Sequence, residues 1–306
     1  MWREICGVVL TFWVLFFNCE NYFDPFDDPL KEDDEFTPAA ERHWTWSRFE
    51  AKRDGIAQMI VAAGDVSGEL PALVGLAEVE NRMVVSQLVH KTMLEELGYG
   101  YVHRESPDAR GIDVALLYRK DVFRVVSVDS LRVPGVVTRD ILYVKLRPPG
   151  PDRASLHVFV VHLPSKRGGE RASNDRRSSA KAVLERAVDS LLTLDPQTKI
   201  VVMGDFNDTK PSVAGLAVPA FDSLTAATRP PGTLRYHGRW EQIDWFFLSP
   251  ALSGTMDIFA PPFLLEPDVT YLGVKPRRTY TGPRYHGGLS DHLPVYLQLR
   301  VPPAQP

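Results

Sequence analysis

The sequence contains little cysteine and no surplus of charge of one sign. Cys6 and Cys19 are its two cysteines in 306 residues, too few for a disulfide framework or a cysteine-based zinc site. The 35 Lys and Arg nearly balance the 39 Asp and Glu, for a formal net charge of −4, which argues against a protein that coats polyanions in general. Hydrophobic residues make up 44% of the chain, enough to bury a core, so intrinsic disorder is excluded.

Long apolar stretches are also scarce, and the main one runs from Ile5 to Phe17. It is shorter than the ~20 residues that a transmembrane helix needs, so no stable membrane span is expected. The stretch fits the apolar part of a signal peptide, but no small-x-small cleavage site follows it. Its Val, Phe, Trp and Thr are typical of a buried strand. We expect a core strand near Thr11–Phe17, with residues 1–10 as a leader remnant or disordered start.

The rest of the chain alternates between strand-like and helix-like segments. Apolar residues recur at helical spacing in 83–97 and 178–194, and none of the proline-rich connections resembles a flexible linker. This order predicts one α/β domain over 11–300 and a proline-rich tail over 301–306, in a monomeric protein of bacterial type. Whether that protein is cytoplasmic or exported stays open. Further strands are expected at 74–77, 112–118, 123–128, 141–146, 156–162, 200–204, 243–248 and 293–299.

Polar side chains suited to catalysis or metal binding accompany six of these apolar runs. In an α/β protein, strand ends are where a site is assembled from distant parts of the chain. One such residue is most often a cap or turn residue, but six occurrences are harder to explain that way. The residues are Asn18 and Glu20, Glu78, His162, Asp205 and Asn207, Asp244, and Asp291 and His292.

The acidic members of this set indicate a metal site. Glu20, Glu78 and Asp291 are hard oxygen ligands, and Asn18 adds a neutral oxygen. This choice of ligands suits Mg²⁺ or Mn²⁺ rather than zinc, which favours His and Cys.

The remaining members indicate a reaction. His162 and His292 can donate hydrogen bonds to an oxyanion, and Asp244 can orient a histidine through its other ring nitrogen. Asp205 can align or deprotonate a water. A divalent metal, an aligned water and donors around an oxyanion together describe hydrolysis of a phosphate ester.

Short motifs in a fixed order then resemble a known family. They are Gly75-Leu-Ala-Glu-Val-Glu-Asn81, Gly204-Asp-Phe-Asn207, Ile243-Asp-Trp245 and Ser290-Asp-His292. They resemble the endonuclease/exonuclease/phosphatase superfamily, the deoxyribonuclease I-like group that includes apurinic endonucleases, inositol polyphosphate phosphatases and neutral sphingomyelinases. The resemblance extends from about Val14 to Leu299. It implies a four-layer α/β sandwich, with two mixed sheets packed face to face, helices outside and the site at one end.

The resemblance also implies how the metal is held. Glu78 matches the principal metal-binding glutamate, and Asp291 matches a further carboxylate of the metal site. Asn18 and Glu20 match the first-strand motif, in which many relatives have Asp where this chain has Glu20.

The same resemblance implies the catalytic roles. Asp205 and Asn207 match the pair that aligns the attacking water and contacts the phosphate. His292 matches the catalytic histidine and Asp244 the aspartate that orients it. His162 stands where some branches carry a second histidine that contacts the phosphate.

Further residues are candidates for substrate binding. The segment His162–Glu170 resembles a loop of bacterial secreted nuclease-like relatives, which implicates Ser165 and Arg167, although a solvent-exposed loop is an equally good interpretation. Arg110 either reaches the phosphate or pairs with Asp113. Arg139 either faces the site or is structural.

Three functions therefore stay open. The first is a metal-dependent nuclease acting on DNA or RNA, favoured by two basic runs beside the motifs, 165–186 and 275–292. The second is a phosphatase or phosphodiesterase acting on a small molecule or lipid headgroup, favoured by the net negative charge. The third is a catalytically inactive binding module, against which the complete residue set argues. We expect the first.

Overall fold

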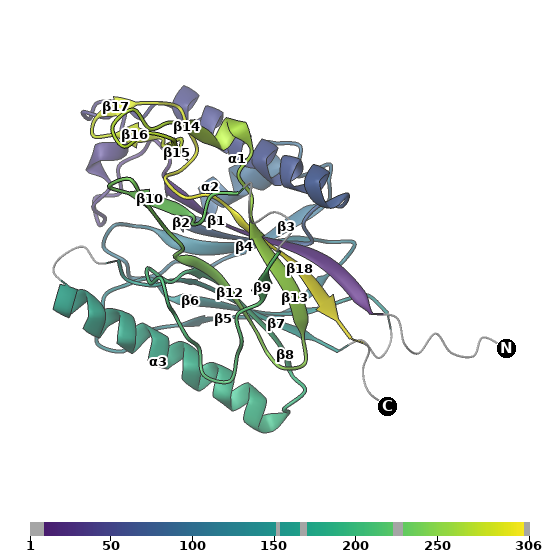
Figure 1. The fold of residues 1–306 in the computed structure, drawn as a ribbon. Helices are drawn as coiled ribbons and strands as arrows, with labels where there is room; N and C mark the ends of the chain where they lie inside the picture. The colour runs from purple at the N-terminus through teal and green to yellow at the C-terminus, as the bar shows by residue number, and fades with distance from the viewer. Residues whose placement is uncertain (1–8, 151–153, 166–169, 223–228, 303–306) are drawn as a thin grey trace.

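The computed structural model describes residues 9–150, 154–165, 170–222 and 229–302. Two mixed β-sheets lie face to face, and helices cover their outer sides (Figure 1). This arrangement confirms the predicted α/β sandwich.

The first sheet is built around β1, which lies between β2 and β18. β1 runs parallel to β2 and antiparallel to β18. The apolar residues from Leu10 to Phe17 therefore lie in the middle of a sheet, as expected of a core strand. The seven strands, in order across the sheet, are β3 (Tyr99–His103), β4 (Asp113–Arg119), β2 (Leu73–Val79), β1 (Leu10–Tyr22), β18 (Val295–Val301), β13 (Ser253–Ile258) and β9 (Ala220–Phe221).

The second sheet has five strands and a parallel pair, β7 and β8, near its centre. Every residue of these two strands is buried, as is typical of parallel strands covered on both faces. The edge strand β5 has no buried residue. In order across the sheet, the strands are β12 (Asp244–Leu248), β8 (Lys199–Asp205), β7 (Leu156–His162), β6 (Ile141–Arg147) and β5 (Arg124–Leu131).

Helices complete the outer layers (Figure 1). α1 (Trp46–Ser67) and α2 (Arg82–His90) lie over the first sheet, and α3 (Glu170–Leu194) packs on the second through Leu184 and Val188. No helix in the described part of the chain has the length and apolar character to cross a membrane. Shorter elements are the 3₁₀ turns Asp34–Phe36 and Pro262–Leu264 and three hairpins, β10 (Leu234–Tyr236) with β11 (Arg239–Glu241), β14 (Leu265–Pro267) with β15 (Val274–Pro276), and β16 (Tyr280–Thr281) with β17 (Arg284–Tyr285).

The helix expected over 83–97 is shorter in the structure. Asn81 caps its start by accepting the N–H groups of Met83 and Val84. The helix ends at His90, because the Thr92 hydroxyl bonds to the carbonyl of Leu88 and redirects the chain into a turn. Beyond that point Leu94 is still buried and Leu97 still packs against the core, which explains why the periodicity continued.

The apolar pattern of the sequence does not mark the length of helix α1. Its buried face contains Phe49, Ile56 and Ile60, but the charged residues Lys52 and Arg53 are buried among them. These charges interrupt the apolar stripe that identifies a helix in a sequence.

His157 on β7 makes the stability of this fold depend on pH. Burial and the nearby Lys145 lower its pKa from 6.5 to about 4, and its Nδ1 lies 2.7 Å from the Tyr143 hydroxyl. The unfolded chain therefore takes up this proton at a higher pH than the folded chain. Its contribution to stability is complete above pH 6.5 and is lost as the pH falls toward 4.

His157→Gln, which does not titrate, is expected to flatten the dependence of Tm on pH between 6.5 and 4. Thermal unfolding at half-unit pH steps measures this slope, and the same substitution at the exposed His237 is the control. Identical slopes in the wild type and His157→Gln would contradict the assignment.

Candidate active site

Strand ends bring the predicted residues together at one end of the sandwich. His162 ends β7 and Asp205 ends β8, and the two are register partners. Asp244 begins β12 and is the register partner of Asp205 on its other side. These three residues therefore lie next to one another on adjacent strands at the same end of the second sheet.

The matching end of the first sheet is shaped by two β-bulges. The pairing of β1 with β2 changes register between Asn18 and Tyr22, and the pairing of β2 with β4 changes between Ala77 and Val79. A bulge redirects side chains, and a non-glycine residue at positive φ stores strain that the surrounding structure must hold. The bulges thus turn their side chains toward the site at a cost in strain. The strained residues, with their φ values, are Glu20 (48°), Asn21 (57°) and Glu78 (56°).

Side chains from both sheets approach one carboxylate oxygen, Asp205 Oδ2. It accepts a hydrogen bond from Asn18 Nδ2 at 3.1 Å. It also lies 3.7 Å from His162 Nε2 and 3.9 Å from His292 Nε2. Burial, and next the charge of Asp244, raise the pKa of Asp205 to about 7. A carboxylate with such a pKa can take a proton from water near neutral pH.

His292 is oriented by a buried carboxylate. Its Nδ1 lies 2.9 Å from Asp244 Oδ2, and the same oxygen accepts the hydroxyl of Thr233. Burial alone lowers the pKa of His292, but the charge and hydrogen bond of Asp244, with help from Asp205 and Asp291, outweigh burial. The pKa therefore lies well above its usual value. His292 is a charged donor whose Nε2 points at the site.

His162 has the opposite protonation state. It is buried, and burial together with Arg139, Arg110 and His292 holds its pKa well below the usual value. Its Nε2 lies 3.8 Å from Glu78 Oε1, whereas its Nδ1 has no hydrogen-bond partner among the described residues. His162 is thus a neutral imidazole whose proton can sit on either nitrogen.

Glu20 is held by the loop that leads to Asp291. Arg278 donates from Nε to Glu20 Oε1 at 2.8 Å, and the Thr279 N–H donates to Oε2 at 2.9 Å. Nη2 of the same arginine lies 3.0 Å from Asp291 Oδ2. Lys52 donates to the carbonyl of Glu20 and to the Thr279 hydroxyl. Burial, and then Asp291, raise the pKa of Glu20 to about 7.

Glu78 and Arg110 lie side by side at the bulges. Glu78 Oε2 accepts the Asn21 N–H at 2.9 Å, and Arg110 Nη2 donates to Asn21 Oδ1 at 2.6 Å. Arg110 lies 3.8 Å from Glu78 Oε2. The other partner considered for it, Asp113, accepts the Ser106 N–H instead. Arg110 therefore faces the site.

Comparison with known families decides the group to which this site belongs. The sequence model of the Endonuclease/Exonuclease/phosphatase family matches residues 13–301. The chain belongs to the endonuclease/exonuclease/phosphatase family. The resemblance found in the motifs is thereby confirmed, and phosphoester hydrolysis is the chemistry of this family.

Solved structures of this family share the fold with the chain at low sequence identity. Truncated TDP2 of Caenorhabditis elegans is 15% identical (TM-score 0.58), over 94% of this chain and 97% of the other. The human nocturnin catalytic domain with bound sulfate is 18% identical (TM-score 0.55), over 96% and 97%. A mannosyl-6-phosphatase of Bacteroides thetaiotaomicron is 15% identical (TM-score 0.59), over 94% and 99%. No curated protein matches the chain in sequence.

The candidate oxygen ligands have the chemistry to hold a divalent cation. Glu78 Oε1 accepts no hydrogen bond from the described residues and faces His162. Asp291 Oδ1 lies 4.0 Å from His292 Nε2, and only its other oxygen contacts Arg278. Asn18 adds an amide oxygen that already accepts the Glu20 N–H. Hard oxygens backed by excess negative charge are the environment that Mg²⁺ and Mn²⁺ prefer.

The carbonyl oxygen of Leu163, directly after β7, accepts hydrogen bonds from two side chains. Asn207 (φ 49°) donates from Nδ2 to the carbonyl of Leu163 at 2.9 Å, and Arg139 donates to the same oxygen at 3.1 Å. Arg139 also pairs with Asp108 at 3.2 Å and is buried, so it supports the loop rather than reaching for substrate. Of the two loop candidates, Ser165 is half-buried directly after this point, and Arg167 lies outside the described residues.

Gly204 explains part of the Gly-Asp-Phe-Asn motif. A Cβ at this position would lie 2.1 Å from the carbonyl oxygen of Val161 on the neighbouring strand. Only glycine lets β8 approach β7 this closely. That approach sets the spacing of His162 and Asp205 one residue later.

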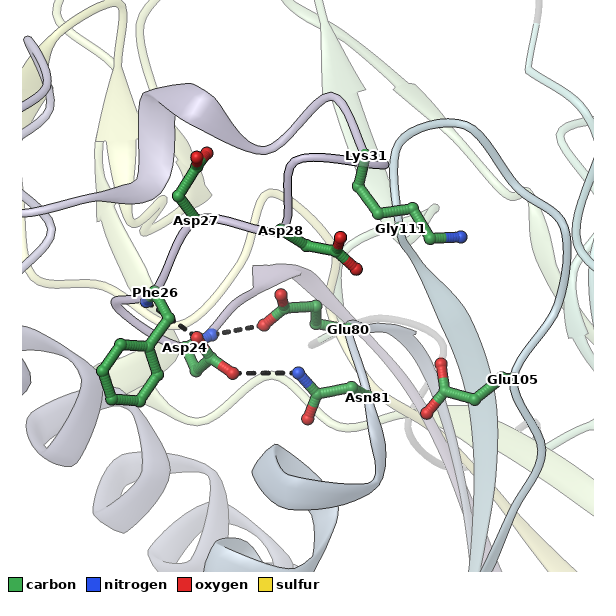
Figure 2. A pocket seen from close by; sticks show the side chains of 9 residues that line it. All are labelled: Asp24, Phe26, Asp27, Asp28, Lys31, Glu80, Asn81, Glu105 and Gly111. Atoms are coloured by element: carbon green, nitrogen blue, oxygen red, sulfur yellow. Dashed lines mark hydrogen bonds between the residues drawn. The ribbon is translucent and has the colours of Figure 1, made fainter.

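An acidic hollow of about 100 Å³ is lined in part by Glu80 and Gly111, which closely follow Glu78 and Arg110 in the chain (Figure 2). Asp24 lines it, with its N–H bonded to Glu80 Oε2 and its carboxylate bonded to Asn81 Nδ2. Burial, and after it charges that include Asp24, raise the pKa of Glu80 to about 9. The full lining is Asp24, Phe26, Asp27, Asp28, Lys31, Glu80, Asn81, Glu105 and Gly111.

The sequence did not predict the residues that hold the candidate site residues in position. Lys52 and Thr233 fix Glu20 and Asp244, yet nothing in their local sequence marks them. Arg278 was noted only as part of a basic run, and its contacts with Glu20 and Asp291 appear only in the structure.

Proposed function

We propose that this family member is a divalent-metal-dependent phosphodiesterase that hydrolyses its substrate by in-line attack of water, and that the substrate is a polynucleotide. The observation that carries the proposal is the convergence on Asp205 Oδ2. Asn18, a neutral His162 and a charged His292 all lie within 3.9 Å of that single oxygen. Such a mixture of base, neutral donor and cationic donor suits a reaction that activates water and stabilises an oxyanion.

Asp205 orients the attacking water and accepts its proton. The Asn18 amide and the Asn207 N–H hold its two oxygens, so the carboxylate has a fixed direction. The pKa near 7 lets it exist as a base at neutral pH and still drive proton transfer.

His292 donates from Nε2 to a phosphoryl oxygen as negative charge develops. Asp244 receives the Nδ1–H and keeps the ring charged and oriented, and Thr233 fixes Asp244 in turn. His162, neutral and on the neighbouring strand, supplies a second N–H to the phosphate. A divalent ion held by Glu78, Asp291 and Asn18 would neutralise charge on the phosphoryl and leaving oxygens.

The polynucleotide is proposed from the charge near β7 and α3. Arg176 is exposed in the first two turns of α3, and Arg177 donates to the carbonyl of Pro164 just after His162. A basic helix start beside a phosphoester site suits a substrate with several phosphates.

A small phosphoester is the second candidate, because specific contacts favour it. Lys275 pairs with Glu266, Arg277 donates to the carbonyl of His286, and Arg278 is taken up by Glu20 and Asp291. The second basic run thus offers few charges to a polyanion, and the acidic hollow would repel one. One structural neighbour is itself named a mannosyl-6-phosphatase.

Hydrolysis of a substrate panel tests both candidates. Single- and double-stranded DNA, RNA, bis-p-nitrophenyl phosphate and p-nitrophenyl phosphate are each assayed with Mg²⁺, Mn²⁺ or EDTA. EDTA is expected to abolish activity and Mg²⁺ or Mn²⁺ to restore it. Polynucleotide cleavage that declines steeply with salt supports the nuclease.

The other outcomes decide against parts of the proposal. Cleavage of small esters alone moves the assignment to the second candidate. Restoration by Zn²⁺ and not by Mg²⁺ or Mn²⁺ contradicts the oxygen-ligand site.

A further inference from the structure

Arg278 lies between two carboxylates that the sequence assigns to the metal. Its Nη2 is 2.7 Å from Glu20 Oε1 and 3.0 Å from Asp291 Oδ2. Its Nε makes a second bond to Glu20 Oε1 at 2.8 Å. One guanidinium therefore fills the space between these carboxylates and neutralises part of their charge.

The loop around Arg278 fixes its backbone. The Gly288 N–H donates to the carbonyl of Arg278 at 3.1 Å, and the Ser290 N–H donates to that of Arg277. A Cβ at Gly288 would lie 1.9 Å from the Arg277 carbonyl oxygen, so this close return requires glycine. The guanidinium is thus presented by a braced turn, directly ahead of Asp291.

Both oxygens of Glu20 bind the arginine turn, and Oε1 takes two bonds from one guanidinium. Arg278 occupies Oε1, and the Thr279 N–H occupies Oε2. Lys52 braces the same turn from α1 through the Thr279 hydroxyl, at 2.7 Å. Glu20 is therefore bound to the arginine turn rather than open toward the site, unlike Glu78.

Arg278 is a cation because a guanidinium is not deprotonated in proteins. Its Nη2 contacts both Glu20 and Asp291 directly. Two carboxylates thus share one arginine. Two-metal phosphoesterase sites place cations ~3.5–4 Å apart between such carboxylates, and here a side chain supplies one of the two positive charges.

We propose that Arg278 is a built-in cation that takes the place of a second divalent ion between Glu20 and Asp291, so that the site binds a single ion on the Glu78 side. This inference rests on the proposed metal-dependent function. It assigns Glu20 to holding Arg278 rather than to the ion, and Asp291 to both cations, one through each oxygen.

Counting bound Mn²⁺ tests the inference directly. Isothermal titration and electron paramagnetic resonance are expected to find one Mn²⁺ per wild-type chain, without the spin coupling of a close pair. Arg278→Met is expected to bind two, and Arg278→Met with Glu20→Gln to return to one. Arg277→Met is the matched control and should bind one, because the Arg277 guanidinium donates to the carbonyl of His286 and not to Glu20 or Asp291.

A further variant does not depend on the folding of Arg278→Met. If Glu20 is not a ligand, Glu20→Gln alone should change the Mn²⁺ dissociation constant by less than about threefold. Loss of a true ligand or its support typically weakens binding ~10–100-fold. Two ions in the wild type, one ion in a folded Arg278→Met, or a tenfold weakening in Glu20→Gln would each overturn the inference.

Failure of the proposed function is recognisable separately. Wild-type protein that hydrolyses bis-p-nitrophenyl phosphate with Mn²⁺ supports that function, whatever the ion count. Wild-type protein that binds no Mn²⁺ and hydrolyses no ester refutes both.

Discussion

Asp205→Asn is expected to lower kcat by about 10²–10³ while leaving KM within a few-fold of the wild type. The amide preserves the shape of the side chain and can still receive the Asn207 N–H. It cannot take a proton from water, and its NH₂ group would face the donors that now point at Oδ2. The loss should therefore appear in the chemical step rather than in binding.

The fold should tolerate this change. Asp205 is buried with a raised pKa, so removing its charge removes a desolvation cost, and Tm should stay the same or rise. Asp208→Asn, the same substitution three residues further on, is the control, because the Asp208 carboxylate accepts the Lys210 N–H and, among the described residues, contacts no member of the candidate site. Steady-state kinetics on the best substrate of the panel measures the effect. Turnover near the wild-type rate would remove Asp205 from the mechanism.

The positions of the site residues followed from the sequence, because each ends or begins an apolar run. His162, Asp205 and Asp244 each border a buried strand, and strands paired in register must bring their ends together. The strand pattern and the motif order were thus sufficient for the α/β class and for the family.

The conformation that aims these residues did not follow from the sequence. The bulges at Glu20 and Glu78 place non-glycine residues at positive φ, where local preference predicts an ordinary strand. Their geometry is imposed by contacts that form only after folding, such as Lys52 with the Glu20 carbonyl and Asn21 with Glu78. A single sequence does not reveal contacts between such distant positions.

The role of Arg278 was hidden for a related reason. In the sequence it belongs to a basic run beside a phosphoester motif, which favours contact with a polyanion. In the structure the same guanidinium is bound by Glu20 and Asp291. Charge counted along the chain cannot distinguish an arginine that meets substrate from one that completes the site.

His292→Ala is expected to lower kcat by about 10²–10³, because it removes the charged donor to the phosphoryl oxygen. The exposed His237→Ala is the control and should keep wild-type kinetics. Kinetics near the wild-type rate in His292→Ala would contradict the role of this histidine.

Asp244→Asn distinguishes orientation of His292 from direct catalysis. Asp244 raises the pKa of His292, so in Asp244→Asn the imidazolium of His292 should lose its proton at a lower pH than in the wild type. The alkaline limb of the kcat/KM profile should therefore shift to lower pH. Because Asp244 acts through His292, the double variant should be no slower than His292→Ala alone. If the fold-losses of the two single variants instead multiply in the double variant, Asp244 contacts the reacting groups itself. Asp244 and His292 would then be two independent catalytic residues.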